Sequence, residues 1–219
     1  DSGEITPLVS GNYEYFVYGP DDRQVAARAG FGVDSADVNG LSPSGDYIVT
    51  TYSRVDAAPV SILIDRQGRE ILTLETADVS GLPEGWQWPE PVKVKAADGK
   101  TDIYGVVYRP PNFSKDQAYP IIDFSCGHPY FSWVPQGSFI NGPCFDAPYL
   151  YAAAYAALGF VVVALEGRGT PYRDKAFQDY SYGHITSASA FEDRIEGIHQ
   201  LASRYPYMDT RRVGIAADD

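Results

Sequence analysis

The sequence predicts an α/β protein in which a run of antiparallel strands precedes a segment of alternating strands and helices. Up to about residue 85, short runs that alternate apolar and polar residues are separated by turn residues, which is typical of antiparallel strands. From about residue 91 onward, apolar runs of strand length alternate with segments of helical periodicity. That alternation is typical of a parallel sheet whose strands are joined by crossover helices.

Composition limits the possible functions before any motif is considered. The chain has 219 residues, of which 44% are hydrophobic and 21% charged, so it can bury a sizeable core. Its net charge of −12 would repel nucleic acid and anionic membranes, and neither is expected as a partner. No apolar run is long enough to span a bilayer.

The antiparallel part begins with an aromatic alternating segment at 13–19 and a second alternating segment at 42–53. A hairpin follows at 60–75, with Gln67 and Gly68 in its turn. Strands at this spacing indicate propeller blades or a sandwich, and the segment is long enough for only one or two blades.

The character of the sequence changes after a linker at 81–91 that is rich in Gly, Pro and Trp. A second hairpin is predicted at 92–110, with Asp98 and Gly99 in the turn. Residues 119–127 then form a buried strand that ends in a loop.

The pattern of the rest of the chain predicts a helix, a strand, a second helix and a second strand. A short apolar helix at 149–160 is stopped by Gly159, and a continuous apolar strand follows at 160–169. An amphipathic helix is predicted at 187–207, capped by Ser187 or Ser189. Its core face is expected to consist of Phe191, Ile195, Ile198, Leu201 and Ala202. The last strand is 212–215.

This order of elements resembles the prolyl oligopeptidase family, and within it the dipeptidyl peptidase IV-like branch. The resemblance is carried by the stretches WPEPVKVKAADGKTDIYGVVYRPPNF, YPIIDFSCGHP, ALGFVVVALEGRGTPYR and FEDRIEGIHQLASRYPYMDTRRVGI. It implies that residues 1–85 are a terminal β-propeller blade segment and that residues 86–219 are the N-terminal part of an α/β-hydrolase peptidase domain.

The family places its nucleophilic serine on a sharp turn after a strand, in the pattern Gly-x-Ser-x-Gly. On this resemblance, Ala217 stands where the first glycine belongs and Asp219 where the serine belongs. The acid and the histidine of the triad follow the serine in the family, so this chain is expected to lack both.

A second catalytic position also differs from the family pattern. The family has a tyrosine that donates to the oxyanion, and the resemblance places Cys126 at that position. A thiol is a weak donor, and loss of a good oxyanion donor costs about 10² to 10³ in rate. We therefore expect the chain alone to be inactive.

Three functions remain open at this point. The first is a dipeptidyl peptidase IV-like serine peptidase, present here without the rest of its triad. The second is an inactive homologue that binds peptides or serves as a scaffold. The weaker third is a hydrolase that uses Asp219 as the nucleophile, as some α/β hydrolases do. A peptide is the expected partner, together with the remainder of the same protein or a second copy, and no cofactor is expected.

Other conspicuous residues receive ordinary interpretations. Ser181 in DYSYGH lacks the leading glycine and the preceding apolar strand of a nucleophile motif. Three histidines, His128, His184 and His199, lack metal-ligand spacing, so no metal site is expected. Arg168 is interpreted as bracing the fold.

Cys126 and Cys144 either form a disulfide or remain two buried thiols. The resemblance implies a periplasmic or secreted protein, with a cytoplasmic one as the alternative. The last strand is expected to have a bare far edge. The isolated chain should therefore be poorly soluble or held by a partner.

Overall fold

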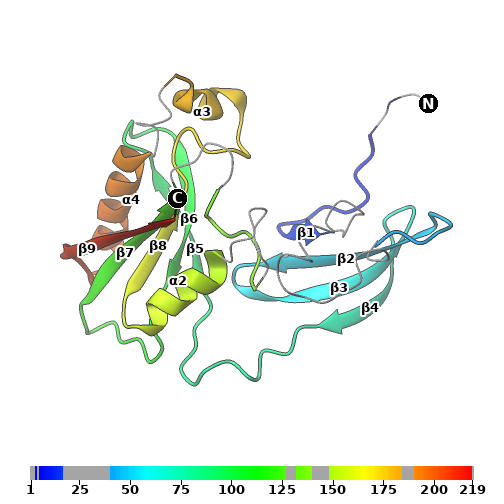
Figure 1. Ribbon diagram of the computed structural model, residues 1–219, viewed down its shortest axis with the longest axis horizontal. Helices are drawn as coiled ribbons and strands as arrows, with labels where there is room; N and C mark the ends of the chain where they lie inside the picture. Colours follow the sequence, from blue (N-terminus) through cyan, green and yellow to red (C-terminus); the bar gives the residue numbers. More distant parts are fainter. Residues whose placement is uncertain are drawn as a thin grey trace. The chain divides into compact units, whose positions relative to one another are not determined.

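The computed structural model describes residues 3, 5–16, 40–126, 132–139, 148–183 and 190–218. The chain divides into two units, which are treated separately here. The first comprises Asp1–Gly81 with Gln136–Ser138, and the second comprises Leu82–Pro135 with Phe139–Asp219 (Figure 1). Sequence analysis placed the boundary after residue 85. The first unit ends slightly earlier and gains a tripeptide from far along the chain.

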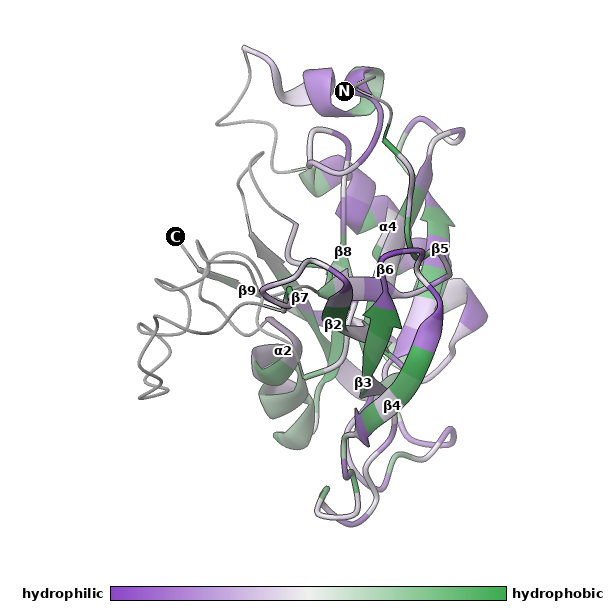
Figure 2. Ribbon diagram, turned by 90° about the vertical axis from the view of Figure 1, so that its right-hand side faces the viewer, coloured by the Kyte–Doolittle hydropathy of each residue, from purple (hydrophilic) through white to green (hydrophobic). Residues whose placement is uncertain are grey.

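The first unit contains one four-stranded antiparallel sheet in the order β1-β2-β3-β4. Its strands are β1 (Glu14–Phe16), β2 (Tyr47–Arg54), β3 (Ala57–Asp65) and β4 (Glu70–Thr76). Thr50, Ile62 and Ile64 are buried on one face. Apolar side chains continue onto β4, where Ile71, Leu72 and Leu74 are exposed (Figure 2).

The turn between β3 and β4 has the residues that its geometry requires. The Asp65 carboxylate accepts the backbone N–H groups of Gln67 and Arg69, both at 2.9 Å. Gly68 has φ 79°, and a Cβ there would lie 1.8 Å from the carbonyl oxygen of Leu8. Only glycine fits such a position, so the turn predicted at this dipeptide is confirmed.

The tripeptide Gln136–Ser138 is fixed to the first unit by buried serines. The backbone N–H of Ser138 donates to Ser53 Oγ at 3.0 Å, and Ser138 Oγ donates to the carbonyl of Ala57. Both serine side chains are fully buried. Buried hydroxyls are stable when they are hydrogen-bonded in this way.

The second unit contains a five-stranded mixed sheet in the order β5-β6-β8-β7-β9. Its strands are β5 (Glu90–Lys95), β6 (Asp102–Tyr108), β7 (Tyr119–Cys126), β8 (Val161–Leu165) and β9 (Met208–Asp218). The pairs β5–β6 and β6–β8 are antiparallel, whereas β7 pairs in parallel with both β8 and β9. The predicted α/β character is confirmed.

Helices cover both faces of this sheet. They are α2 (Pro148–Ala157), α3 (Lys175–Gln178) with the 3-10 turn η2 (Asp179–Ser181), and α4 (Phe191–Arg204). Arg194 of α4 bonds Asp123, whereas α2 packs beside Phe124. Consecutive strand residues point to opposite faces, so α2 and α4 lie on opposite sides of the sheet (Figure 1).

The core of the second unit lies between the sheet and α4, and β8 is buried along its whole length. Ile198 and Leu201 of α4 are buried as predicted, but Phe191 and Ile195 are 44% and 53% exposed. The predicted core face was wrong at these two positions because charged Asp193 and Arg194 occupy the buried side of the first turn.

The predicted helix cap was also wrong. The N-cap of α4 is Ala190, which has φ 50° and makes no side-chain capping bond. Ser187 and Ser189 lie outside the described residues. Glu192 and Asp193 in the first turn instead complement the positive end of the helix dipole.

Candidate functional site at the carboxyl ends of the parallel strands

The parallel strands β7, β8 and β9 end at one edge of the sheet, and their connections leave that edge in different directions. The chain leaves β7 through α2 on one face and leaves β8 through α4 on the other. In open α/β sheets, ligands bind at such a switch point, outside the carboxyl ends of the strands. This edge is therefore the candidate site.

One of the two catalytic positions identified in the sequence, Cys126, lies at this edge. Cys126 is the last residue of β7 and pairs in register with Asp218, the last residue of β9. Asp219 is the next residue along the chain and lies outside the described residues, as do Cys144, His128 and His184. Parallel pairing thus places Cys126 beside Asp218, although the two are far apart in the sequence. The catalytic roles expected for Cys126 and Asp219 remain predictions.

On the α4 face, a buried ion pair lies next to this edge. Arg194 Nε donates to Asp123 Oδ2 at 3.0 Å, and the two side chains are only 4% and 5% exposed. Burial raises the pKa of the Asp123 carboxyl, and the adjacent guanidinium only partly offsets this effect. Among the described residues, no donor reaches the buried Asp123 Oδ1.

A second arginine holds the loop after β8 to the start of α4. Arg168 Nη2 lies 2.8 Å from Asp193 Oδ1, and the backbone N–H of Arg168 donates to Asp193 Oδ2 at 2.9 Å. The guanidinium also contacts Asp98 at 3.3 Å and lies 4.4 Å from the centre of the Tyr180 ring. Multiple charge-assisted bonds of this kind fix geometry, and the expected bracing role of Arg168 is confirmed.

The segment after β8 contributes structure rather than a nucleophile. Glu166 accepts the backbone N–H of Tyr104 at 2.9 Å and pairs with Arg173. Burial raises the pKa of the Glu166 carboxyl, an effect that these partners oppose. Ser181 is buried, and its Oγ donates to the carbonyl of Gln178 at 3.0 Å. The hydroxyl is therefore engaged with the backbone.

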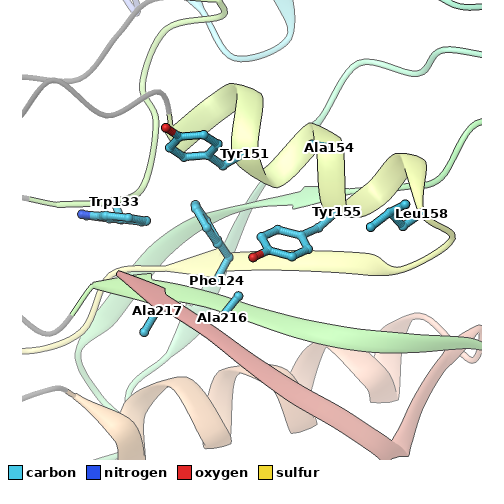
Figure 3. A pocket seen from close by; sticks show the side chains of 8 residues that line it. All are labelled: Phe124, Trp133, Tyr151, Ala154, Tyr155, Leu158, Ala216 and Ala217. Carbon is cyan, nitrogen blue, oxygen red and sulfur yellow. The ribbon is translucent and has the colours of Figure 1, made fainter. Parts of the chain in front are cut away.

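On the α2 face, the same edge opens into a cavity of about 350 Å³ (Figure 3). Aromatic and aliphatic side chains line it, and none of them is charged. They are Phe124, Trp133, Tyr151, Ala154, Tyr155, Leu158, Ala216 and Ala217. Phe124 packs on Trp133 with 5.0 Å between ring centroids and on Tyr155 with 6.0 Å.

Sequence reasoning missed this cavity and the Asp123–Arg194 pair. The cavity combines side chains from four separate segments, and their proximity depends on strand order. The ion pair had a signal, because Asp123 interrupts an apolar strand and Arg194 falls next to the apolar stripe of a helix. When each of two buried segments carries a single residue of opposite charge, the two side chains are expected to form an ion pair.

Two features are absent from the described part of the chain. Among those residues, no cluster of three or more His, Cys, Asp or Glu side chains could hold a metal ion. None of the described helices is long and apolar enough to traverse a lipid bilayer. His199, the one histidine among the described residues, is exposed on α4.

Comparison with known proteins shows which proteins this chain is similar to. Residues 148–216 match the model of the prolyl oligopeptidase family. Human dipeptidyl peptidase 8 is 32% identical over 130 residues, which cover 58% of this chain and 13% of that protein. Dipeptidyl-peptidase 5 of Aspergillus oryzae is 28% identical over 176 residues, covering 80% of the chain and 23% of that protein. The chain therefore spans less than a quarter of either relative.

Solved structures agree with these sequence matches. A dipeptidyl aminopeptidase IV homologue from Bacteroides ovatus superposes with a TM-score of 0.68 and 28% identity, covering 81% of this chain and 24% of that one. Dipeptidyl peptidase 4 from Porphyromonas gingivalis has the same fold, with a TM-score of 0.62 at 22% identity over 80% of this chain and 24% of that one. These neighbours support the predicted combination of a propeller end with part of an α/β-hydrolase domain.

Proposed function

Because the chain belongs to the prolyl oligopeptidase family, in its dipeptidyl peptidase IV-like branch, we propose that its protein binds the N-terminal ends of peptides. In the first form of the proposal, it also removes short N-terminal units from them. The observation that carries the proposal is the site edge itself. There, Cys126 and Asp218 pair at the switch point of a sheet that is similar to those of dipeptidyl peptidases.

Binding can be tested separately from cleavage. Short peptides with a free N-terminus are expected to bind the chain at least about tenfold more tightly than the same peptides with an acetylated N-terminus. Isothermal titration calorimetry measures both affinities under the same conditions. Equal affinities, or no binding of either form, would contradict the proposal.

A second form of the proposal is a homologue that binds peptides without cutting them. Asp219 and Cys126 favour it, because the family resemblance puts them at the positions of the serine and the oxyanion tyrosine. An aspartate does not reproduce a base-activated serine, and a thiol donates weakly to an oxyanion.

Hydrolysis of dipeptidyl nitroanilide reporters decides between the two forms. The assay uses the protein that contains this chain, because the chain alone is expected to be inactive in both forms, and the non-cleaving form predicts no turnover above background. Turnover that a fluorophosphonate abolishes would establish a serine nucleophile and exclude the non-cleaving form. A covalent ester on Asp219, detected by mass spectrometry after substrate treatment, would instead indicate an aspartate nucleophile.

A further inference from the structure

We propose that helix α4 closes the outer edge of the five-stranded sheet, with Gln200 as the main closing residue, so that a second copy of the protein cannot add a strand to β5. In the described sheet, β5 comes first in the order β5-β6-β8-β7-β9 and has a neighbouring strand on one side only. An edge strand with free backbone groups is a template for pairing with another polypeptide. This inference is independent of the proposed peptide-binding function.

The pairing of β5 with β6 shows which backbone groups of β5 face outward. The N–H of Ala96 donates inward, to the carbonyl of Thr101 at 2.9 Å, where the antiparallel β5–β6 ladder ends. The direction of the backbone groups alternates along a strand. Lys93, Lys95 and Ala97 therefore direct their N–H and carbonyl groups to the outer edge, where an added strand would bind.

The side chain of Gln200 occupies both outward groups of Lys95. Its Oε1 accepts the backbone N–H of Lys95 at 2.9 Å, and its Nε2 donates to the carbonyl of the same residue at 3.0 Å. A neighbouring antiparallel strand would use this same N–H and this same carbonyl for its own two bonds. The amide of Gln200 therefore takes the place of a strand at the centre of the outward series.

The partners of this amide fix its orientation. Nε2 donates both to the carbonyl of Lys95 and to Glu196 Oε1, each at 3.0 Å, and these two oxygens can only accept. The backbone N–H of Lys95 can only donate, so it requires the amide oxygen. Glu196 lies one helical turn before Gln200 and holds the amide in the orientation that matches the strand.

Two more side chains of α4 continue the closure along β5. Arg204 Nη1 donates to the carbonyl of Lys93 at 2.8 Å, and Asp193 Oδ1 accepts the N–H of Ala97 at 3.0 Å. With Gln200, these positions are spaced by seven and four residues, which places them on one face of the helix. From Asp193 to Arg204 a helix rises about 16 Å, and four strand residues span about 14 Å. The helix therefore runs beside β5, in the opposite direction, over a matching length (Figure 2).

Hydrogen exchange, resolved to single residues by mass spectrometry, tests the contact in the protein that contains this chain. The backbone amide of Lys95 should be protected, and Gln200→Ala should speed its exchange at least about tenfold because the acceptor is removed. His199→Ala makes the same substitution at the neighbouring, exposed position of α4 and should change the rate less than about twofold. The amide of Ala97, which is bonded to Asp193, should keep its rate in both variants. Equal exchange of the Lys95 amide in all three proteins would refute the contact.

Self-association tests the closure of the edge. Gln200→Ala combined with Arg204→Ala frees three outward backbone groups of β5. Copies of this double variant should associate at least about tenfold more tightly than the parent protein, as measured by sedimentation velocity over a concentration series. His199→Ala combined with Ser203→Ala changes two exposed positions of α4 and should associate as the parent does. No gain in the first double variant, or an equal gain in both, would overturn the proposal.

A proline in β5 shows whether the gained association occurs at this edge. Pro91 already occupies an outward position of the strand, where its missing N–H costs no bond to β6. Lys93→Pro removes the N–H at the next outward position in the same way. Added to the first double variant, it should return the association to the level of the parent protein. Association that persists would place the contact elsewhere and refute β5 as the edge that α4 closes.

Discussion

Replacing Arg194 by methionine is expected to lower the free energy of unfolding by about 3 to 5 kcal/mol, because it leaves a buried carboxylate without its charged partner. Asp123 and Arg194 are both almost completely buried, so water cannot take over the role of the guanidinium. Urea denaturation followed by circular dichroism measures the change. A loss below about 1 kcal/mol would show that the pair contributes no more than a surface salt bridge does.

A double variant and a pH series test the cause of this loss. Asp123→Leu combined with Arg194→Met removes both charges and should recover most of the lost stability, since apolar replacements of buried pairs are often neutral or stabilising. Burial holds the pKa of Asp123 above its unfolded value, so the stability contributed by this group falls as the pH rises through that raised pKa. Without Arg194 the pKa rises further. The cost of Arg194→Met should therefore be largest near neutral pH and shrink as the carboxyl takes up a proton in acid.

Gly105→Ala should destabilise the protein by about 1 to 3 kcal/mol, because the added methyl group has no room. Gly105 lies in β6, where that strand pairs antiparallel with β8. A Cβ there would lie 2.3 Å from the carbonyl oxygen of Ala164 and 2.4 Å from a methyl group of Leu165. Backbone atoms cannot rotate away, so the two strands must separate. Thermal unfolding of the purified variant measures the effect.

Gly81 provides the matched control. A Cβ at Gly81 would have no heavy atom within 4 Å. Gly81→Ala should therefore be neutral or stabilise the protein by up to about 1 kcal/mol, through the lower entropy of the unfolded chain. If both alanine variants lost stability equally, close packing at Gly105 could not be the reason.

Local sequence pattern was sufficient to predict the structure of segments in which a single periodicity or turn signal dominates. The uninterrupted apolar run of β8 predicted a strand buried on both faces, and all five residues of that strand are buried. The turns at Gly68 and Gly99 were predicted because glycine is needed there for positive φ, which is 79° and 69° respectively.

Local sequence pattern did not predict the structure where distant segments form ion pairs or combine to line a cavity. Phe191 and Ile195 fit a helical core stripe, yet the buried side of that turn belongs to Asp193 and Arg194. Their partners, Arg168 and Asp123, lie on other elements. The cavity likewise depends on β9 lying beside β7, a pairing that no local periodicity encodes.

The order β8-β7-β9 also bears on how the protein is made. The middle strand of the three is the first to leave the ribosome, and both of its neighbours come later in the chain. Tyr119 pairs with Met208, and at typical synthesis rates the intervening stretch of about 90 residues takes on the order of ten seconds to emerge. Both edges of β7 are unpaired until β8 emerges, and the edge that pairs with β9 stays unpaired for the whole of that time. Exposed strand edges promote aggregation. The nascent chain should therefore depend on a chaperone until β9 has been synthesised.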